Sequence, residues 1–279
     1  MIKLGLIGYP VSHSLSPKIQ NAALQACGLE GEYSLYPIAP DDMQALKDFL
    51  DCVRLDEITG LNVTIPHKQN VIQFMDELTS TAKAIGAVNI IYMRENKLIG
   101  DNTDAAGFLV DLKKFLTKEI LNYGDLNALV LGAGGSARSV VYALCNDGWN
   151  VTIAARRLEQ AQELAAQFEG INIVELNLQT FQPLNFQLLV NTTPLGMTPN
   201  VDQSPLPENM SLSKHMKIYD LVYNPRETKL VREARSQGLQ AITGLGMLIE
   251  QAALGFELWT GHKPPKDILF EAVGATRPD

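Results

Sequence analysis

The segment from Asn62 to Lys68 (NVTIPHK) combines reactive side chains with a proline that shapes the backbone. Proline disfavours helix for the residue before it but suits the first turn of a helix that follows. We therefore expect a strand over residues 60–65 and a helix over 67–75, with Thr64 and Lys68 at the turn between them. Ligands of α/β proteins bind at such strand ends. The two side chains either meet a substrate or are an ordinary helix cap and a solvated lysine.

Other polar residues stand where strands and helices are expected to meet. Ser16 begins a helix and either caps it or, with Ser14, binds a carboxylate at the positive end of the helix dipole. Asn89 lies in an apolar strand, where a buried amide needs either a structural or a substrate partner. Asp104 is either a catalytic acid or a helix N-cap. Gln251 interrupts an apolar helix and faces either a cleft or a neighbouring polar group.

A glycine-rich turn between the apolar strand ALVL and a helix has the pattern GxGxxA. The first glycine permits a tight turn, and the second lets backbone N–H groups approach a pyrophosphate at the helix N-terminus. The small last residue lets the helix pack closely on the strand. The pattern predicts a dinucleotide site made of Gly132, Ala133, Gly134, Gly135, Ser136 and Ala137.

The end of the following strand indicates which dinucleotide binds. NAD sites place an acidic residue there to accept a hydrogen bond from the ribose 2′-hydroxyl. This chain has Arg156 and Arg157 instead, and a guanidinium can pair bidentately with a 2′-phosphate. NADP(H) is therefore favoured over NAD(H), the alternative being that the arginines are merely solvated.

The remaining pattern predicts two α/β domains. Strands and helices alternate up to a hairpin of AVNIIY and KLIGD, and a second strand–helix–strand unit follows a helix that begins near residue 104 and a polar turn at 121–125. A strongly apolar helix follows Gly244. We expect an α/β substrate domain over 1–103, completed by 241–279 through the returning C-terminal helix, and a Rossmann-like domain over 104–240.

Composition excludes several classes of protein. With 46% hydrophobic and 19% charged residues the chain is typical of a globular protein, and its net charge of −8 argues against non-specific binding to nucleic acid or to acidic membranes. The three cysteines do not indicate a disulfide framework, and the four histidines show no metal-ligand spacing. Without a secretory signal or a membrane-length apolar run, we expect a cytoplasmic protein.

Together these segments resemble the shikimate dehydrogenase family, from GYPVSHSLSP through GLNVTIPHK, AIGAVN, GDNTDAAGF, GAGGSAR, NTTPLGM and YDLVYNPRET to GLGMLIEQAALGFELWTG. The resemblance implies NADPH-dependent reduction of 3-dehydroshikimate to shikimate, on the pathway to chorismate and the aromatic amino acids. It implies that Lys68 and Asp104 are the catalytic pair. For substrate binding it implies Ser14, Ser16, Thr64, Asn89, Tyr223 and Gln251, together with the catalytic pair. On the nicotinamide side of the cofactor it implies Thr192, Met197 and Gly244, and it implies Leu221 as a further cofactor-binding residue.

The chain departs from the family where the 2′-phosphate binds, because Arg157 and Gln160 replace the usual residues beside Arg156. This leaves the stringency of NADP over NAD open. The alternatives are a quinate-using relative, against which Ser16 argues, a non-catalytic NADP(H)-sensing protein, and another carbonyl reductase of the same plan. The sequence does not distinguish a monomer from a homodimer.

Overall fold

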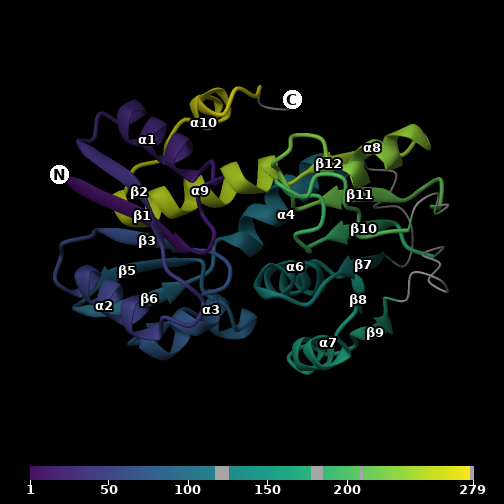
Figure 1. Cartoon of the computed structure of the whole chain (residues 1–279), viewed down its shortest axis with the longest axis horizontal. Coiled ribbons are helices and arrows are strands. Elements are labelled where there is room, and N and C mark those ends of the chain that lie inside the picture. The colour runs from purple at the N-terminus through teal and green to yellow at the C-terminus, as the bar shows by residue number, and fades with distance from the viewer. Residues whose placement is uncertain (117–125, 177–184, 208–209, 211, 277–279) are drawn as a thin grey trace. The chain divides into compact units, whose positions relative to one another are not determined.

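The computed structural model describes residues 1–116, 126–176, 185–207, 210 and 212–276, which form two compact units (Figure 1). Unit 1 comprises residues 1–107 and 249–279, and unit 2 comprises residues 108–248. The divisions fall inside helices α4 (Asp104–Phe115) and α9 (Leu245–Thr260), whereas the boundaries that the sequence predicts, 103/104 and 240/241, precede each helix. The polar turn expected at 121–125 lies outside the described residues.

Unit 1 contains a six-stranded sheet in the order β2-β1-β3-β5-β6-β4. Its strands are β1 (Ile2–Gly8), β2 (Gly31–Pro37), β3 (Gly60–Val63), β4 (Glu77–Leu78), β5 (Ile90–Arg94) and β6 (Lys97–Asp101). β1 is parallel to both β2 and β3, and β5 and β6 form the expected antiparallel hairpin beside β3. As a result, the carboxyl ends of β1, β3 and β6 and the amino end of β5 lie at one edge of the sheet.

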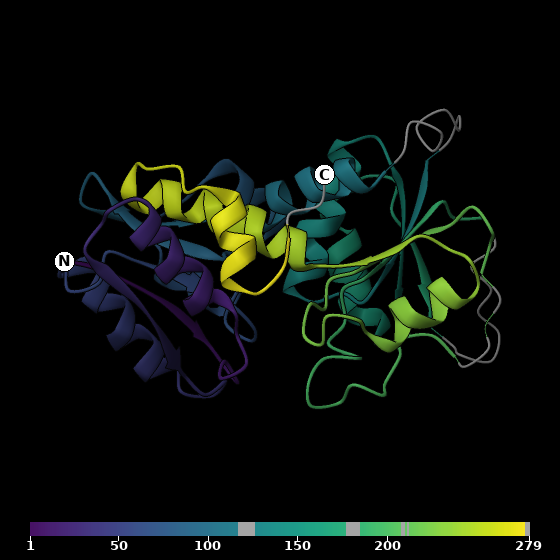
Figure 2. The ribbon, with the colours of Figure 1, turned by 90° about the horizontal axis from the view of Figure 1, so that it is seen from above.

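Helices cover both faces of this sheet (Figure 2). They are α1 (Ser16–Ala26), α2 (Met43–Arg54), α3 (Ser80–Ile85), α9 and α10 (Lys266–Ala272). On α2, Leu46, Leu50 and Val53 recur at helical spacing and are buried against the sheet, because the helix is amphipathic. On the opposite face, Trp259 of α9 packs against the apolar side chains of β1, β2 and β5.

Unit 2 contains a second six-stranded sheet in the order β12-β11-β10-β7-β8-β9. Its strands are β7 (Asn127–Leu131), β8 (Asn150–Ala155), β9 (Asn172–Glu175), β10 (Leu188–Asn191), β11 (Lys217–Asp220) and β12 (Ala241–Thr243), all parallel to their neighbours. The strand order reverses between β7 and β10, which is the topological switch point where doubly wound sheets bind dinucleotides. The Rossmann-like prediction is confirmed.

The helices of unit 2 are α6 (Gly135–Asn146), α7 (Leu158–Ala165), α8 (Lys229–Ser236) and the parts of α4 and α9 that belong to it. Leu230, Val231 and Ala234 of α8 pack into the core on one face of the sheet. α6 lies on the other face (Figure 2). β7 is buried on both faces, as its uninterrupted apolar run ALVL indicates.

One element was predicted wrongly. Instead of a helix over 67–75, the chain makes turns and then a short 3₁₀ helix, η1 (Asn70–Phe74). Its hydrogen bonds include i→i−3 pairs such as Ile72 N to Gln69 O, and the neighbouring β-branched Val71 and Ile72 are poor α-helix formers. Within the described ranges, no helix is long and apolar enough to cross a membrane.

Candidate active site

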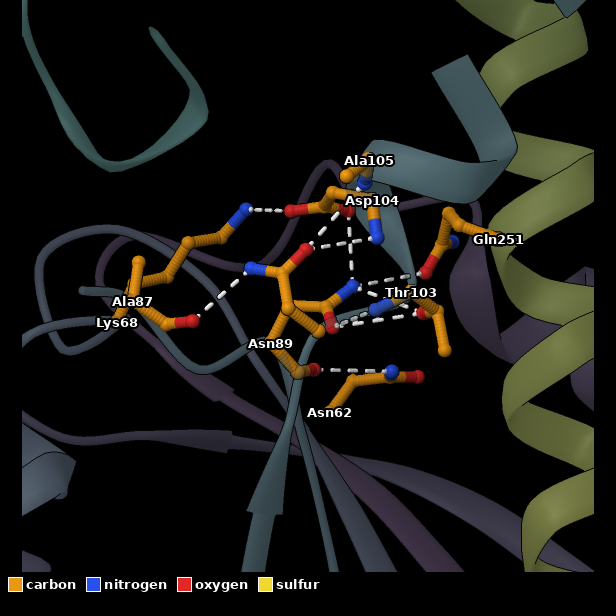
Figure 3. Close-up of polar contacts among 9 residues, drawn as sticks. Asn62, Lys68, Ala87, Asn89, Thr103, Asp104, Ala105 and Gln251 are labelled. Carbon is orange, nitrogen blue, oxygen red and sulfur yellow. Dashed lines mark hydrogen bonds and ion pairs between the residues drawn. The ribbon is translucent and has the colours of Figure 1, made fainter. Parts of the chain in front are cut away.

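The reactive side chains of unit 1 gather at the sheet edge where β3 ends, β5 begins and β6 ends (Figure 3). Lys68 follows β3, Asn89 directly precedes β5, and Asp104 opens α4 three residues after β6. The register Asn62 to Ile90 and Ile90 to Asp101 aligns these strand ends. Sheet pairing therefore brings together residues that are far apart in the sequence.

Lys68 and Asp104 form a nearly buried ion pair. Lys68 Nζ lies 2.5 Å from Asp104 Oδ2, and the two side chains are only 10% and 8% exposed. The backbone around Lys68 is held on both sides, because its carbonyl accepts from Val88 N at 2.8 Å and the ring Nε2 of buried His67 contacts Ile38 O at 2.8 Å. Burial weakens competition from water, so the ammonium is held in one place and its charge is locally compensated.

Asn89 lies at the centre of this polar cluster, between Asp104, Thr103 and Gln251 (Figure 3). Its Nδ2 donates to Asp104 Oδ1 at 2.8 Å, to Thr103 Oγ1 at 3.1 Å and to Gln251 Oε1 at 3.4 Å. Its Oδ1 accepts from Thr103 N at 2.8 Å. The amide thus has structural partners and also holds the carboxylate that faces Lys68.

Asn102, which the sequence analysis missed, holds the start of α4. Its Oδ1 accepts from the backbone N–H groups of Asp104 (3.1 Å) and Ala105 (3.3 Å), and its Nδ2 donates to Ala87 O at 3.0 Å. Asp104 is therefore not the helix cap, and its side chain is directed to Lys68 and Asn89 instead. An Asn before an apolar helix is a recognised N-cap signal, so this cap could have been predicted from the motif NTD.

Of the other predicted substrate residues, Gln251 joins this cluster through Asn89. Ser16 is buried at the start of α1 but does not cap it; Ser14 Oγ accepts from Ser16 N at 3.2 Å. Thr64 is half-buried directly after β3, in the same unit. Tyr223 belongs to unit 2.

In unit 2, the glycine-rich turn has the features that a pyrophosphate needs. Gly132 has a φ of +104°, and a Cβ there would lie 2.9 Å from Thr192 Oγ1, so a side chain is excluded. A Cβ on Gly134 would meet nothing within 4 Å, and no side chain caps α6. Ala133, Gly135 and Ser136 are not fully buried, while Ala137 is buried against the sheet. The loop therefore leaves room and uncapped N–H groups for an anion.

The segment after β10 lies beside this turn, and the segment after β11 lies beside Gly244. Thr192 donates to Leu131 O through both its backbone N (3.0 Å) and its Oγ1 (2.7 Å). A Cβ on Gly244 would lie 2.4 Å from Leu221 O, which brings that residue against the end of β11. Met197 is 43% exposed, although it is large and apolar.

Arg156 and Arg157 directly follow β8, and both are exposed. Within the described residues neither guanidinium has an ion-pair partner. Both are available to an anion at the position where a dinucleotide presents its ribose. Among the described side chains, no group of three or more His, Cys, Asp or Glu could hold a metal ion.

Models of three protein-domain families match the chain. Residues 6–91 match the shikimate dehydrogenase substrate binding domain. Residues 115–228 match shikimate/quinate 5-dehydrogenase, and residues 244–273 match the shikimate 5′-dehydrogenase C-terminal domain.

Whole-chain relatives and solved structures agree with these matches. Shikimate dehydrogenase (NADP⁺) of Carboxydothermus hydrogenoformans is 40% identical over 278 residues, covering 97% of this chain and 95% of the relative. A crystal structure of a shikimate dehydrogenase in complex with NADP⁺ is 37% identical, with a TM-score of 0.86 and coverage of 98% of this chain and 94% of that one. The shikimate 5-dehydrogenase of Thermus thermophilus in complex with NADP(H) and shikimate is 39% identical, with a TM-score of 0.85 and 98% coverage of both chains.

Proposed function

The chain belongs to the shikimate dehydrogenase family, and from this premise we propose that it interconverts 3-dehydroshikimate and shikimate with NADP(H) as cofactor. The reaction is a step in the synthesis of chorismate and the aromatic amino acids. The observation that carries the proposal is the nearly buried Lys68–Asp104 pair within the polar cluster of unit 1. The names of the relatives do not favour a quinate user or a non-catalytic sensor.

We assign the catalytic pair and most of the substrate contacts to unit 1, and cofactor binding to unit 2. In support, the substrate binding domain model matches residues of unit 1, and the glycine-rich turn lies in unit 2. Ser14 and Ser16 would bind the substrate carboxylate at the start of α1, where hydroxyls and the helix dipole both favour an anion. The other residues proposed to contact the substrate are Thr64, Lys68, Asn89, Asp104, Tyr223 and Gln251.

The cluster can transfer one proton, and the atom that carries this proton is Lys68 Nζ. NADP(H), when bound, supplies or accepts the hydride. Lys68 Nζ has three N–H bonds, of which Asp104 Oδ2 takes one, so two are left for a substrate oxygen. In the reduction, Lys68 stabilises negative charge on the carbonyl oxygen and donates the proton that this oxygen gains. Asn89 keeps the Asp104 carboxylate directed at the ammonium, and thereby keeps the lysine oriented.

Replacing Lys68 by alanine tests this role. We expect kcat to fall by about 10² to 10⁴, the usual contribution of a positioned acid or base, with a much smaller change in the dissociation constant of shikimate. Truncation also leaves Asp104 buried without its cation, so stability is expected to fall by about 3–5 kcal/mol. Shikimate binding is measured by calorimetry, kcat by the absorbance of reduced cofactor, and stability by urea unfolding.

Lys266→Ala is the matched control, because it breaks another pair of the same unit, Lys266 Nζ to Glu250 Oε2 at 2.5 Å. Glu250 is only 2% exposed, so this variant also loses stability but should keep the kcat of the wild type. If Lys68→Ala keeps its kcat, or if Lys266→Ala loses it equally, Lys68 is not the proton donor.

Cofactor choice is tested with Arg156→Gln and Arg157→Gln. We expect each to raise KM for NADP⁺ and to leave KM for NAD⁺ unchanged, since only NADP⁺ carries the 2′-phosphate. Turnover of shikimate and quinate with each cofactor gives the substrate and cofactor specificity directly. Equal KM changes for both cofactors would show that the arginines do not recognise the 2′-phosphate.

That the protein is a monomer or homodimer in the cytoplasm stays a prediction. Light scattering tests the oligomeric state, and cell fractionation tests the localisation.

A further inference from the structure

A carboxylate without a cation is buried in unit 2, at the end of β11. Asp220 is fully buried and, among the described residues, has no ion-pair partner. Its Oδ1 accepts from Asn191 Nδ2 at 2.8 Å and from Val222 N at 3.1 Å, and its Oδ2 accepts from Thr228 Oγ1 at 2.6 Å. Burial raises the pKa of Asp220 to about 6, although the three hydrogen bonds act to lower it. Burying a carboxylate without a cation is unfavourable, so the position of Asp220 in this core requires an explanation.

The hydrogen bonds of Asp220 continue in two directions. Toward β10, Asn191 Oδ1 accepts from Thr193 N (3.0 Å) and Thr193 Oγ1 (2.7 Å), which shapes the turn after that strand. Toward α8, Thr228 Oγ1 caps the helix by accepting from Val231 N at 3.2 Å. We call Thr193, Asn191, Asp220 and Thr228 the Asp220 ladder. It ties the segment after β10 to the segment after β11.

The two segments tied by the ladder carry residues that the family resemblance assigns to cofactor binding, of which Thr192 and Met197 are on the nicotinamide side. Thr192 and Met197 follow Asn191, and Leu221 follows Asp220. Leu221 N also donates to Asn191 O at 2.9 Å, and a Cβ on Gly244 would lie 2.4 Å from the carbonyl oxygen of Leu221. None of these residues takes part in the ladder through its side chain, so the ladder controls where their backbones lie.

We propose that Asp220 is a positioning residue for the nicotinamide half of the bound cofactor, acting through Asn191 and Thr228. This inference rests on the proposed function, since it presumes that NADP(H) binds in unit 2. A carboxylate is suited to the task because it only accepts hydrogen bonds and can receive several at once. Three donors from three parts of the chain converge on it, which no neutral side chain of the same size could satisfy equally well. Hydride transfer is sensitive to displacements of about 1 Å, so the loss of this alignment affects the chemistry.

The substitution Asp220→Asn tests the proposal, because it keeps the size of the side chain but puts a donor where an acceptor is needed. We expect the dissociation constant of NADP⁺ to rise about tenfold, as for one buried hydrogen bond left unmade, and kcat to fall as well. Adenosine 2′,5′-bisphosphate, which lacks the nicotinamide half, should bind with unchanged affinity.

Two further variants separate alignment from general damage. Thr193→Val removes one hydroxyl from the end of the ladder and keeps the side-chain shape, so it should show the same selective loss at smaller amplitude even if Asp220→Asn does not fold. Asp111→Asn alters another buried acid of unit 2, which accepts from Tyr219 Oη at 2.5 Å and is not in the ladder. It should leave the ratio of the two affinities as in the wild type.

The proposal is overturned if Asp220→Asn weakens NADP⁺ and the bisphosphate equally, or if it weakens neither. It is also overturned if Asp111→Asn reproduces the selective loss. A failure of the proposed function has a different signature, in which the wild-type protein itself does not oxidise shikimate with NADP⁺.

Discussion

Gly107 in the first turn of α4 sets how closely α9 approaches the polar cluster, and Gly107→Ala should disturb that approach. A Cβ on Gly107 would lie 2.7 Å from Gln251 N, 2.8 Å from Gln251 Cβ and 3.0 Å from Gln251 Cα. Carbon atoms in ordinary contact are about 3.5–4.0 Å apart, so α9 must move away by roughly 0.7 Å or more. Two of the three atoms belong to the backbone of a helix and cannot rotate out of the way.

The expected cost differs between stability and activity. Overpacking a core lowers the free energy of unfolding by about 1–3 kcal/mol. The higher helix propensity of alanine offsets about 1 kcal/mol of this, so the net loss of stability is about 0–2 kcal/mol. The contact between Gln251 Oε1 and Asn89 Nδ2 is already 3.4 Å long, so a shift of this size breaks it. We therefore expect kcat/KM for shikimate to fall by about tenfold to a hundredfold, with the NADP⁺ dissociation constant unchanged.

The assay is steady-state kinetics on Gly107→Ala, Gln251→Ala and the double variant. If Gly107 acts through Gln251, the two effects are not additive, because the second substitution removes a contact that is already lost. Gly255→Ala is the control on the same helix, since the three atoms nearest to its Cβ belong to side chains and the closest, Ile90 Cδ1 at 3.0 Å, is the end of a side chain. Additive effects, or an unchanged kcat/KM in Gly107→Ala, would show that Gly107 does not act through Gln251. An unaffected Gln251→Ala would instead argue against Gln251 as a substrate residue.

Two further results are expected from urea unfolding. Asn102→Ala should lower the free energy of unfolding by about 1–2 kcal/mol, because it removes the cap of α4, and an unchanged value would show that water replaces the cap. For Asp220, burial raises the folded-state pKa from 3.8 to about 6, so the folded chain binds a proton that the unfolded chain has released between these values. The resulting stabilisation is present below pH 3.8 and lost as the pH rises through 6, so wild type should lose about 3 kcal/mol relative to Asp220→Asn between these limits. A difference that does not vary with pH would contradict the raised pKa.

Features encoded over short stretches could be read from the amino-acid sequence. The turn from Gly132 to Ala137 was recognisable because its constraints, a positive φ and open space for an anion, act within a few residues. The hairpin of β5 and β6 and the apolar helix α9 were predicted from their hydrophobic patterns. The helix expected over 67–75 was wrong, because proline and the polar residues after it indicate a turn and do not specify which helix follows.

The chemistry available to this protein can be read from its residues alone: a lysine, an acid, an amide and hydroxyls near strand ends, and a dinucleotide turn with arginines beyond it. Which alternative each polar residue takes depends on the folded chain. Asn89 and Gln251 are 162 positions apart, and their hydrogen bond depends on the packing of α9 against α4. Asp104 is free to pair with Lys68 because Asn102 caps the helix in its place. Such choices follow from desolvation, since a buried polar group without a partner is unfavourable and the fold determines which partner is in reach.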